Sequence, residues 1–275
     1  MSQPAVCIVT GAAAGLGAAI TAGLLEAGHR VVATDIKPSE THAKYRDSGR
    51  LIEIAADVSS ASDSSNVIEA CLKDFGSVDV LVNNAGICAG VIRPNYVTQP
   101  VETGEGDAQI WAKIVQVNLI GTIMMTHFAI PHLKNSPRGR IINLSTTWET
   151  MLRVGFASYG ASKAGIEAFS HAMAKELAGK VTVNTIFPGG PADTAQVPDD
   201  IGIPRDKLLR PDVMVPPILW LMSEEADHIT GKRFSAAMWD QAKPLEERLE
   251  SASEPAAWPQ LHRPMVMQAR GNLRS

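Results

Sequence analysis

The hydrophobic positions of the first 240 residues form short apolar runs that alternate with longer helical patterns. The runs are rich in β-branched residues and contain few polar positions, which is typical of strands buried on both faces of a parallel sheet. We expect strands at residues 5–9, 31–34, 51–55, 80–82, 140–144, 181–186 and 233–238. This alternation predicts an α/β fold, a single-domain Rossmann-like doubly wound parallel sheet flanked by helices on both faces.

Helices are predicted between these strands, where apolar residues recur at helical spacing. We expect them at residues 16–27, 63–75, 110–133 and about 217–223, the first two ended by Gly28 and Gly76. The catalytic domain is expected to span residues 1–240. Residues 241–275 are rich in proline, alanine and charge, with Trp258 and Leu261 as the obvious apolar anchors, so we expect an extension rather than a second domain.

Composition restricts the partners and the compartment. The 275 residues carry a formal net charge of −4 without a basic stripe, which makes nucleic acid an unlikely ligand. The start has no basic and apolar leader, and no run of about 18 apolar residues occurs, so we expect a cytoplasmic protein without a membrane partner. Cys7, Cys71 and Cys88 form no metal-ligand pair, the histidines are spaced without one, and the odd thiol suits a reducing compartment. We therefore expect no metal.

A glycine-rich turn follows the first predicted strand and leads directly into a helix. Its glycines are Gly11, Gly15 and Gly17, with Ala14 and Leu16 between them. This arrangement lets the backbone turn tightly and directs amides of the helix N-terminus at a pyrophosphate, which predicts a dinucleotide site. The alternative is that glycine and alanine only allow the helix to pack closely on the sheet.

A carboxylate at the end of the second predicted strand supports the dinucleotide interpretation. Asp35 lies 18 positions beyond Gly17 and is followed by Ile36. A carboxylate there can bind both ribose hydroxyls of NAD and repels the 2′-phosphate of NADP. The sequence therefore favours NAD, although Lys37 is close enough to keep NADP open. Asp35 could instead be a turn residue before Pro38.

Five ordered motifs between about residues 4 and 240 resemble those of the short-chain dehydrogenases/reductases. They are Thr10 to Gly17 in the pattern T-G-x-x-x-G-x-G, Asp57-Val58, Asn83-Asn84-Ala85-Gly86, Asn118, and Tyr159 with Lys163. The resemblance implies that Asp57 bonds the adenine amine, that Val58 bonds the ring through its backbone, and that Asn84, Ala85 and Gly86 floor the adenosine channel. It also implies that Asn118 kinks its helix and holds a water.

The resemblance assigns the central chemistry to Tyr159 and Lys163, which are spaced i, i+4 on a helix expected to begin near Ala157. Tyr159 would transfer the substrate proton, while Lys163 grips the nicotinamide ribose and, with the nicotinium charge, lowers the pKa of Tyr159. Without the other motifs, the two residues would be read as an amphipathic surface pair.

After the sixth strand, Pro188 and Gly189 match the family's loop beside the nicotinamide, and Thr194 would bond the carboxamide, although turn chemistry also accounts for these residues.

One position departs from the family pattern. The third catalytic residue of the family is usually a serine 13 positions before the tyrosine, where this chain has Thr146. Ser145 lies one position earlier, and strand alternation turns its side chain to the opposite face. We therefore expect Thr146 to fill the serine role. The alternative is that a local bulge brings Ser145 into the site and Thr146 only packs.

The substrate side is expected to be built from loops at the carboxyl ends of the strands, including a long connection at residues 87–110. Arg93 and Arg153 could clamp an anionic group, although solvated loop arginines are more common. Thr147 and Trp148 are further substrate candidates, the latter as a flat apolar wall. The sequence does not choose among sugars, hydroxy acids and aryl alcohols.

These features predict an NAD-dependent oxidoreductase that transfers hydride between nicotinamide and a secondary alcohol or ketone. A dinucleotide-sensing regulator without turnover is the alternative, and lyase or epimerase chemistry is a third interpretation for which no extra acid or base is apparent. A homodimer or homotetramer is expected, because the family pairs the helices at residues 110–133 and around Tyr159 between subunits. The first of these carries Ile114, Val117, Ile120, Met124 and Met125.

Overall fold

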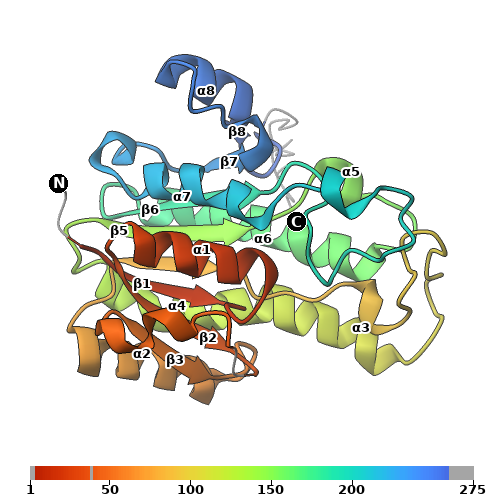
Figure 1. The fold of residues 1–275 in the computed structure, drawn as a ribbon, viewed down its shortest axis with the longest axis horizontal. Coiled ribbons are helices and arrows are strands. Elements are labelled where there is room, and N and C mark those ends of the chain that lie inside the picture. Colours follow the sequence, from red (N-terminus) through yellow and green to blue (C-terminus); the bar gives the residue numbers. More distant parts are fainter. Residues whose placement is uncertain (1–3, 38–39, 260–275) are drawn as a thin grey trace, which may run out of the picture.

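The computed structural model describes residues 4–37 and 40–259. Its described strands form one sheet of eight in the order β3-β2-β1-β4-β5-β6-β7-β8 (Figure 1). Neighbouring strands from β3 to β7 are parallel, and β8 pairs antiparallel with β7. The strands are β1 (Val6–Thr10), β2 (Arg30–Asp35), β3 (Leu51–Ala55), β4 (Val80–Asn83), β5 (Gly139–Leu144), β6 (Val181–Phe187), β7 (Lys232–Ser235) and β8 (Ser253–Pro255). The predicted fold class is confirmed.

Helices cover both faces of the sheet, which is why its central strands are buried throughout (Figure 1). Cys7 and Val9 of β1 belong to the apolar cluster under α1 and α7, whereas Val6 and Ile8 belong to the cluster under α2, α4 and α6. The helices are α1 (Gly15–Glu26), α2 (Ala61–Phe75), α3 (Ala108–Val115), α4 (Gly121–Leu133), α5 (Trp148–Met151), α6 (Ala157–Glu176), α7 (Val215–Leu221) and α8 (Leu245–Ala252).

The last strand predicted in the domain is shorter than expected. The sequence predicts residues 233–238 as extended, but β7 ends at Ser235 and a 3-10 turn follows at Ala236–Met238. The turn brings Trp239 against Trp220 of α7, with ring centroids 4.8 Å apart. Aromatic packing across the sheet edge therefore overrides the strand pattern here.

The helix predicted at residues 110–133 is interrupted. The chain forms α3, a π-helical segment at Gln116–Ile120, and then α4. By length and composition, the 26 residues Ala108–Leu133 are apolar enough to cross a membrane. However, α4 packs against α2, β4 and β5, and α3 packs against α6, so the stretch is a covering helix of this α/β fold.

The chain after residue 240 contains two elements that the sequence did not predict. Helix α8 leads into β8, which extends the sheet by pairing Phe234 with Ser253 and Arg233 with Glu254. The anchor Trp258 lies with its ring centroid 4.8 Å from that of Trp148. Leu261 lies outside the described residues. The boundary near residue 240 stays a prediction, but the described part of the extension is joined to the sheet.

Subunit assembly also stays a prediction, and the structure changes its basis. Of the five apolar residues expected to mark the interface, Ile114 and Met125 are buried within the protomer. Val117 and Met124 are half-buried, and Ile120 is 36% exposed. We expect a dimer or tetramer that covers this remaining apolar surface, because a monomer would leave it in water. Light scattering at micromolar concentration tests this, and a monomeric mass would contradict it.

Candidate functional site

The candidate residues meet at the carboxyl edge of the sheet. Because β1, β4, β5 and β6 run parallel, the residues that follow them emerge at the same edge. These segments are the glycine turn after β1, Asn84 to Gly86 after β4, Ser145 and Thr146 after β5, and Pro188 and Gly189 after β6. Tyr159 and Lys163 of α6 reach the same edge, since Lys163 Nζ donates to the Leu144 carbonyl at 2.8 Å.

The glycine turn is shaped by close backbone contacts. A Cβ on Gly17 would lie 2.1 Å from the Gly11 carbonyl oxygen and 2.4 Å from Asn84 Nδ2, so only glycine fits. Gly15 adopts φ +55°, a region that favours glycine. Asn84 Nδ2 donates to the carbonyls of Thr10 and Gly11 at 2.8 and 2.9 Å, which ties the turn to the end of β4. Both sequence interpretations of the glycines therefore apply, since the turn is tight and also closely packed.

The start of α1 fits a pyrophosphate. Ala14 is its N-cap, with extended backbone and no capping side-chain hydrogen bond, and Leu16 is half-buried in the first turn. The first amides of an uncapped helix attract an anion. Thr194, from the loop after β6, lies directly above: a Cβ on Gly15 would meet Thr194 Cγ2 at 3.0 Å. The residues predicted for the phosphate end are thus brought together.

Asp35 ends β2 beside the glycine turn. Its Oδ2 accepts a hydrogen bond from the Ala13 amide at 3.0 Å, and its Oδ1 accepts one from the Lys37 amide at 3.4 Å. The carboxylate is therefore held at the rim of the turn, where a ribose would lie. Ile36 is 66% exposed next to it, available to cover an adenine ring. These positions fit the adenosine half of a dinucleotide.

Asp57 and Val58 follow β3 on the same side. The Asp57 carboxylate accepts from the Ser59 amide and hydroxyl at 2.9 and 2.6 Å and pairs with Lys113 of α3 at 3.0 Å. Val58 is buried against Gly121, and its carbonyl accepts from Ser64. Asp57 therefore already has partners on the protein, and its proposed contact with adenine stays a prediction.

Asn118 lies inside the π-helical segment and is fully buried. Its Oδ1 accepts from the Ile87 amide at 2.8 Å, while its Nδ2 donates to the Ile87 carbonyl at 2.9 Å and to Ser162 Oγ at 3.0 Å. The side chain thus joins the covering helix to the loop after β4 and to α6. The helix is disrupted where the sequence expects a kink, and such π-bulges are frequent at functional sites.

The Tyr159 and Lys163 pair is buried more deeply than a surface pair would be. Lys163 is 4% exposed, and its Nζ lies 5.7 Å from the centroid of the Tyr159 ring. Burial lowers the pKa of Lys163 to about 8, although the nearby Glu167 and Cys88 act to raise it. The amphipathic-surface interpretation is therefore wrong.

The expected effect on Tyr159 is not produced by the protein alone. Burial raises the pKa of Tyr159 above its ordinary value and Cys88 adds to this, whereas a hydrogen bond with the Thr146 side chain acts to lower it. The sequence predicts a lysine-lowered pKa, but desolvation of the phenolate outweighs the opposing contributions. Tyr159 is consequently held as a neutral phenol at neutral pH in the protein by itself.

Thr146 and Ser145 occupy different environments. The Thr146 side chain lies close enough to Tyr159 to act on its pKa. Ser145 Oγ is buried and has no hydrogen-bond partner within the described part of the chain. These environments favour Thr146 as the hydroxyl beside the tyrosine, the position that strand alternation predicts for it. Which hydroxyl serves catalysis stays a prediction.

The substrate candidates are held by local contacts. Thr147 caps α5 by accepting from the Thr150 amide at 3.1 Å. Arg93 forms an ion pair with Glu105 and donates to the Gln99 carbonyl, and Arg153 donates to the Val97 carbonyl at 3.4 Å. These contacts engage donors of both guanidinium groups with neighbouring loop residues, so a role of the two arginines as an anion clamp stays a prediction. Trp148 is half-buried and makes contacts discussed below.

Residues that sequence analysis missed close the crevice between the loops after β4 and β6. Gln196 Nε2 donates to the Gly86 carbonyl at 2.7 Å, and the Tyr96 hydroxyl donates to the Gln196 carbonyl at 3.0 Å. Cys88 donates to the Tyr96 hydroxyl at 3.2 Å and lies near Tyr159. No sequence signal marks these pairs, because Gln196 and Gly86 are 110 residues apart.

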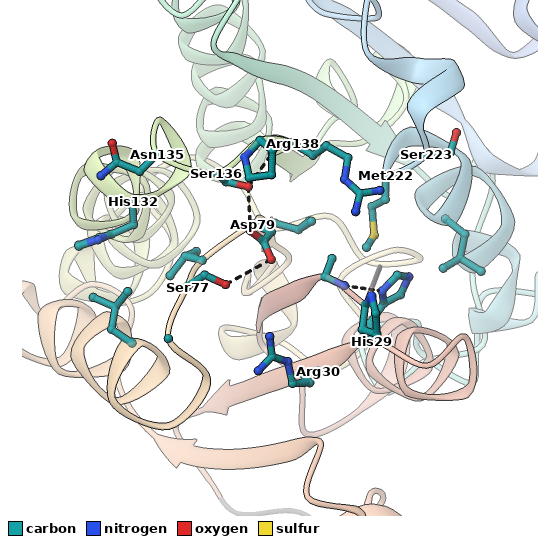
Figure 2. A pocket seen from close by; sticks show the side chains of 18 residues that line it. His29, Arg30, Ser77, Asp79, His132, Asn135, Ser136, Arg138, Met222 and Ser223 are labelled. Atoms are coloured by element: carbon teal, nitrogen blue, oxygen red, sulfur yellow. Dashed lines mark hydrogen bonds between the residues drawn. The ribbon is translucent and has the colours of Figure 1, made fainter. Parts of the chain in front are cut away.

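A cavity of about 460 Å³ lies at the opposite, amino edge of the sheet (Figure 2). The Asp79 carboxylate there accepts from the Ser136 hydroxyl at 2.7 Å, the Val6 amide at 2.8 Å and the Ser77 hydroxyl at 3.4 Å. His29 Nδ1 accepts from the Ala5 amide. Because these polar groups satisfy one another, the cavity is not the candidate site. Over the described ranges, no group of three His, Cys, Asp or Glu side chains could hold a metal ion.

Comparison with known proteins agrees with this geometry. Residues 5–199 match the family model described as short chain dehydrogenase. The chain is 30% identical over 240 residues to the 3-oxoacyl-acyl-carrier-protein reductase FabG of Thermotoga maritima, covering 82% of this chain and 94% of that protein. It is 36% identical over 239 residues to the 2,5-dichloro-2,5-cyclohexadiene-1,4-diol dehydrogenase LinX of Sphingobium indicum, covering 82% and 92%.

A solved structure gives the same result. The 3-ketoacyl-acyl-carrier-protein reductase of Brucella melitensis, complexed with NADH, superposes with a TM-score of 0.72 at 29% identity, covering 82% of this chain and 93% of that one. The family model, the relatives and the solved structure match the part of the chain that forms the sheet. The protein therefore belongs to the short-chain dehydrogenase/reductase family and is an oxidoreductase.

Proposed function

We propose that the protein transfers hydride between NAD and a secondary alcohol or ketone, with Tyr159 as general acid and base. The observation that carries this proposal is the cluster of Thr146, Tyr159 and Lys163 at the sheet edge that also holds the glycine turn and Asp35. An acid-base group beside a dinucleotide cradle is what hydride transfer at a C–OH carbon requires.

Each residue of the cluster has a separate task in this proposal. The bound nicotinamide supplies the hydride acceptor or donor. The Tyr159 phenol donates its proton to the substrate oxygen in reduction and accepts the hydroxyl proton in oxidation. Thr146 hydrogen-bonds the same oxygen and orients it. Lys163 binds the nicotinamide ribose and keeps a positive charge near Tyr159. Lys163 is buried and Tyr159 is half-buried, which limits access of water.

The substrate class is a carbonyl compound or alcohol, in the form of a sugar, hydroxy acid or aryl alcohol. One observation supports it. The relatives above are named as a reductase of oxoacyl groups and as a dehydrogenase of a cyclic diol. Trp148, the first residue of α5, is stacked against Arg233 and Trp258, so its role as a substrate wall stays a prediction. We propose further that the enzyme works in the cytoplasm, which the free, buried Cys7, Cys71 and Cys88 support.

Asp35 is expected to set the cofactor preference. In the wild type NAD should bind much more tightly than NADP, because the 2′-phosphate would meet the Asp35 carboxylate. Asp35→Ala should weaken NAD binding and strengthen NADP binding, so that the ratio of the dissociation constants falls about tenfold or more. Fluorescence titration with both cofactors measures this. Asp47→Ala, an exposed carboxylate in the following 3-10 turn, is the matched control for net charge. Equal wild-type affinities for the two cofactors would contradict the assignment.

The test of the function is a screen of the purified protein for NAD reduction with sugars, hydroxy acids and aryl alcohols, and for NADH oxidation with the matching ketones and oxoacyl thioesters. Tyr159→Phe, which keeps the ring and removes the hydroxyl, is the control and should be inactive. Turnover that depends on Tyr159 supports the proposal. NAD binding without turnover on any of these classes would favour the non-catalytic sensor instead.

A further inference from the structure

Arg233 of β7 is a buried cation that the proposed function does not use. Its side chain is 1% exposed, and a guanidinium removed from water requires partners for its donors. All three of its nitrogens have one. Nε pairs with Glu167 Oε1 at 3.2 Å, Nη1 with Glu254 Oε1 at 2.5 Å, and Nη2 donates to the backbone carbonyl of Thr146 at 2.6 Å. One side chain thus connects α6, the C-terminal extension and the end of β5.

The guanidinium also lies over two rings at the site. Its central carbon is 3.7 Å from the centroid of Trp148 and 4.2 Å from that of Phe187. Trp148 follows Thr146 by two positions, and Phe187 directly precedes Pro188 and Gly189. Flat contacts of this kind stabilise the orientation of both partners. Arg233 therefore contacts the segments after β5 and at the end of β6, which the resemblance to the family places on either side of the nicotinamide.

The acidic partners differ in burial. Glu167 lies one turn beyond Lys163 on α6, is fully buried, and accepts from the Thr185 hydroxyl at 3.2 Å. Glu254 lies on the edge strand β8, is 48% exposed, and its Oε1 also accepts from Trp148 Nε1 at 3.2 Å. Arg233 thus neutralises the buried carboxylate of Glu167 through Nε. Through Nη1 it is held by Glu254 of the extension.

The extension reaches Trp148 a second time, through Trp258. The two rings lie with centroids 4.8 Å apart. Ala257 and Trp258 both adopt left-handed backbone, at φ 60° and 49°, which is unfavourable for residues other than glycine. Such a conformation is maintained only where the surrounding contacts hold it. The extension is therefore held against the site by an ion pair, a hydrogen bond and a ring contact.

We infer that Arg233 is a positioning residue, which Glu254 of the extension orients and which aligns the Thr146 hydroxyl with Tyr159 by holding the Thr146 carbonyl. This inference rests on the proposed function. A buried ion pair often stabilises a protein no more than apolar packing does, so stability alone does not account for three charged side chains here. In this inference the extension after residue 240 contributes Glu254 to the arrangement of the catalytic residues, in addition to pairing β8 with β7.

Glu254 is the position to change, because it is half-exposed and its loss leaves Glu167 paired with Arg233. We expect Glu254→Ala to lower kcat about tenfold, the loss of one charge-assisted hydrogen bond. The dissociation constant for NAD should stay unchanged, since Glu254 bonds to Arg233 and Trp148 and not to the glycine turn or Asp35. Glu254→Gln, which keeps an acceptor for Arg233 and Trp148, should recover most of kcat. Glu250→Ala, an exposed glutamate on α8, is the matched control and should not change kcat.

The decisive readout is a double-mutant cycle with Thr146→Ala. If Arg233 acts through Thr146, Glu254→Ala should lower kcat less than twofold in the Thr146→Ala background, against about tenfold in the wild type. A merely structural role would give the same fold-change in both backgrounds, and that result would overturn the inference. An unchanged kcat of Glu254→Ala in the wild type would overturn it as well.

A second variant tests the role of Arg233 without leaving an unpaired buried charge. Arg233→Met combined with Glu167→Gln keeps similar side-chain volumes and removes both buried charges together, and its fold is checked by circular dichroism. We expect kcat to fall at least as much as in Glu254→Ala, and full activity would contradict the inference. Failure of the proposed function is recognised separately, because the wild type itself would then show no turnover in the screen, and the inference would fall with it.

Discussion

Lys163→Met is expected to abolish measurable turnover and, at the same time, to raise the free energy of unfolding at pH 7 by about 2 kcal/mol. Lys163 is an ammonium with 4% exposure, and burial lowers its pKa from 10.5 to about 8. At about 1.4 kcal/mol per unit, this shift corresponds to a penalty of about 3 kcal/mol, of which about 1 kcal/mol is offset by the bond to the Leu144 carbonyl. Methionine fills similar volume without the charge, and Glu167 remains paired with Arg233.

The pH dependence of this difference follows from proton binding. Below about pH 8 both the folded and the unfolded wild type carry the charge, so the penalty is fully present. Between about pH 8 and 10.5 the unfolded chain binds more protons than the folded one, so wild-type stability rises with pH. The advantage of Lys163→Met should therefore shrink over this window.

Urea unfolding of both proteins at pH 7, 8, 9 and 10 measures the effect. Lys175→Met, an exposed lysine on the same helix, is the matched control and should show no such convergence. A variant that is less stable than the wild type at pH 7, or a stability difference independent of pH, would contradict the assignment of Lys163 as a buried, destabilising cation kept for the reaction.

Thr146→Ala is expected to lower turnover by about two orders of magnitude, by analogy with the loss of one donor to a developing oxyanion. The Thr146 side chain lies close enough to Tyr159 to act on its pKa, and its hydroxyl would meet the same substrate oxygen. Thr146→Ser keeps the hydroxyl and should retain most activity. Ser145→Ala should lower turnover less than tenfold, because Ser145 Oγ is buried and has no hydrogen-bond partner in the described part of the chain.

Steady-state kinetics of the three variants, with NAD affinity measured in parallel, distinguish the two hydroxyls. The alternative register predicts the reverse order. If Ser145→Ala is the inactive enzyme while Thr146→Ala turns over normally, the alignment of this chain with the family serine is wrong by one position.

Much of the scaffold could be predicted from sequence because its signals are local. The runs that predict strands at residues 5–9 and 181–186 are observed as β1 (Val6–Thr10) and β6 (Val181–Phe187), both buried throughout. Continuous β-branched residues need burial on both faces, and a parallel sheet under two helix layers provides it. The glycine turn and the i, i+4 spacing of Tyr159 and Lys163 are likewise properties of neighbouring residues.

Other features depend on residues that are distant in the chain. The direction of the pKa shift of Tyr159 depends on how completely the fold removes it from water, which spacing to Lys163 does not reveal. β8 forms because an edge strand at β7 offers unpaired backbone groups, and three residues of an otherwise polar extension carry no strand pattern.

By itself, the sequence determined the sheet, the glycine turn, the family and the candidate acid-base pair, because short-range periodicity and spacing encode them. Only the tertiary structure decided that Arg233 is buried, that it pairs with Glu167 66 residues away and that it holds a carbonyl 87 residues away. A charged residue in a short edge strand is read from sequence as solvated. Its burial is possible only where the fold brings opposite charges and acceptors to it, and hydrophobic patterning contains no information about such long-range partners.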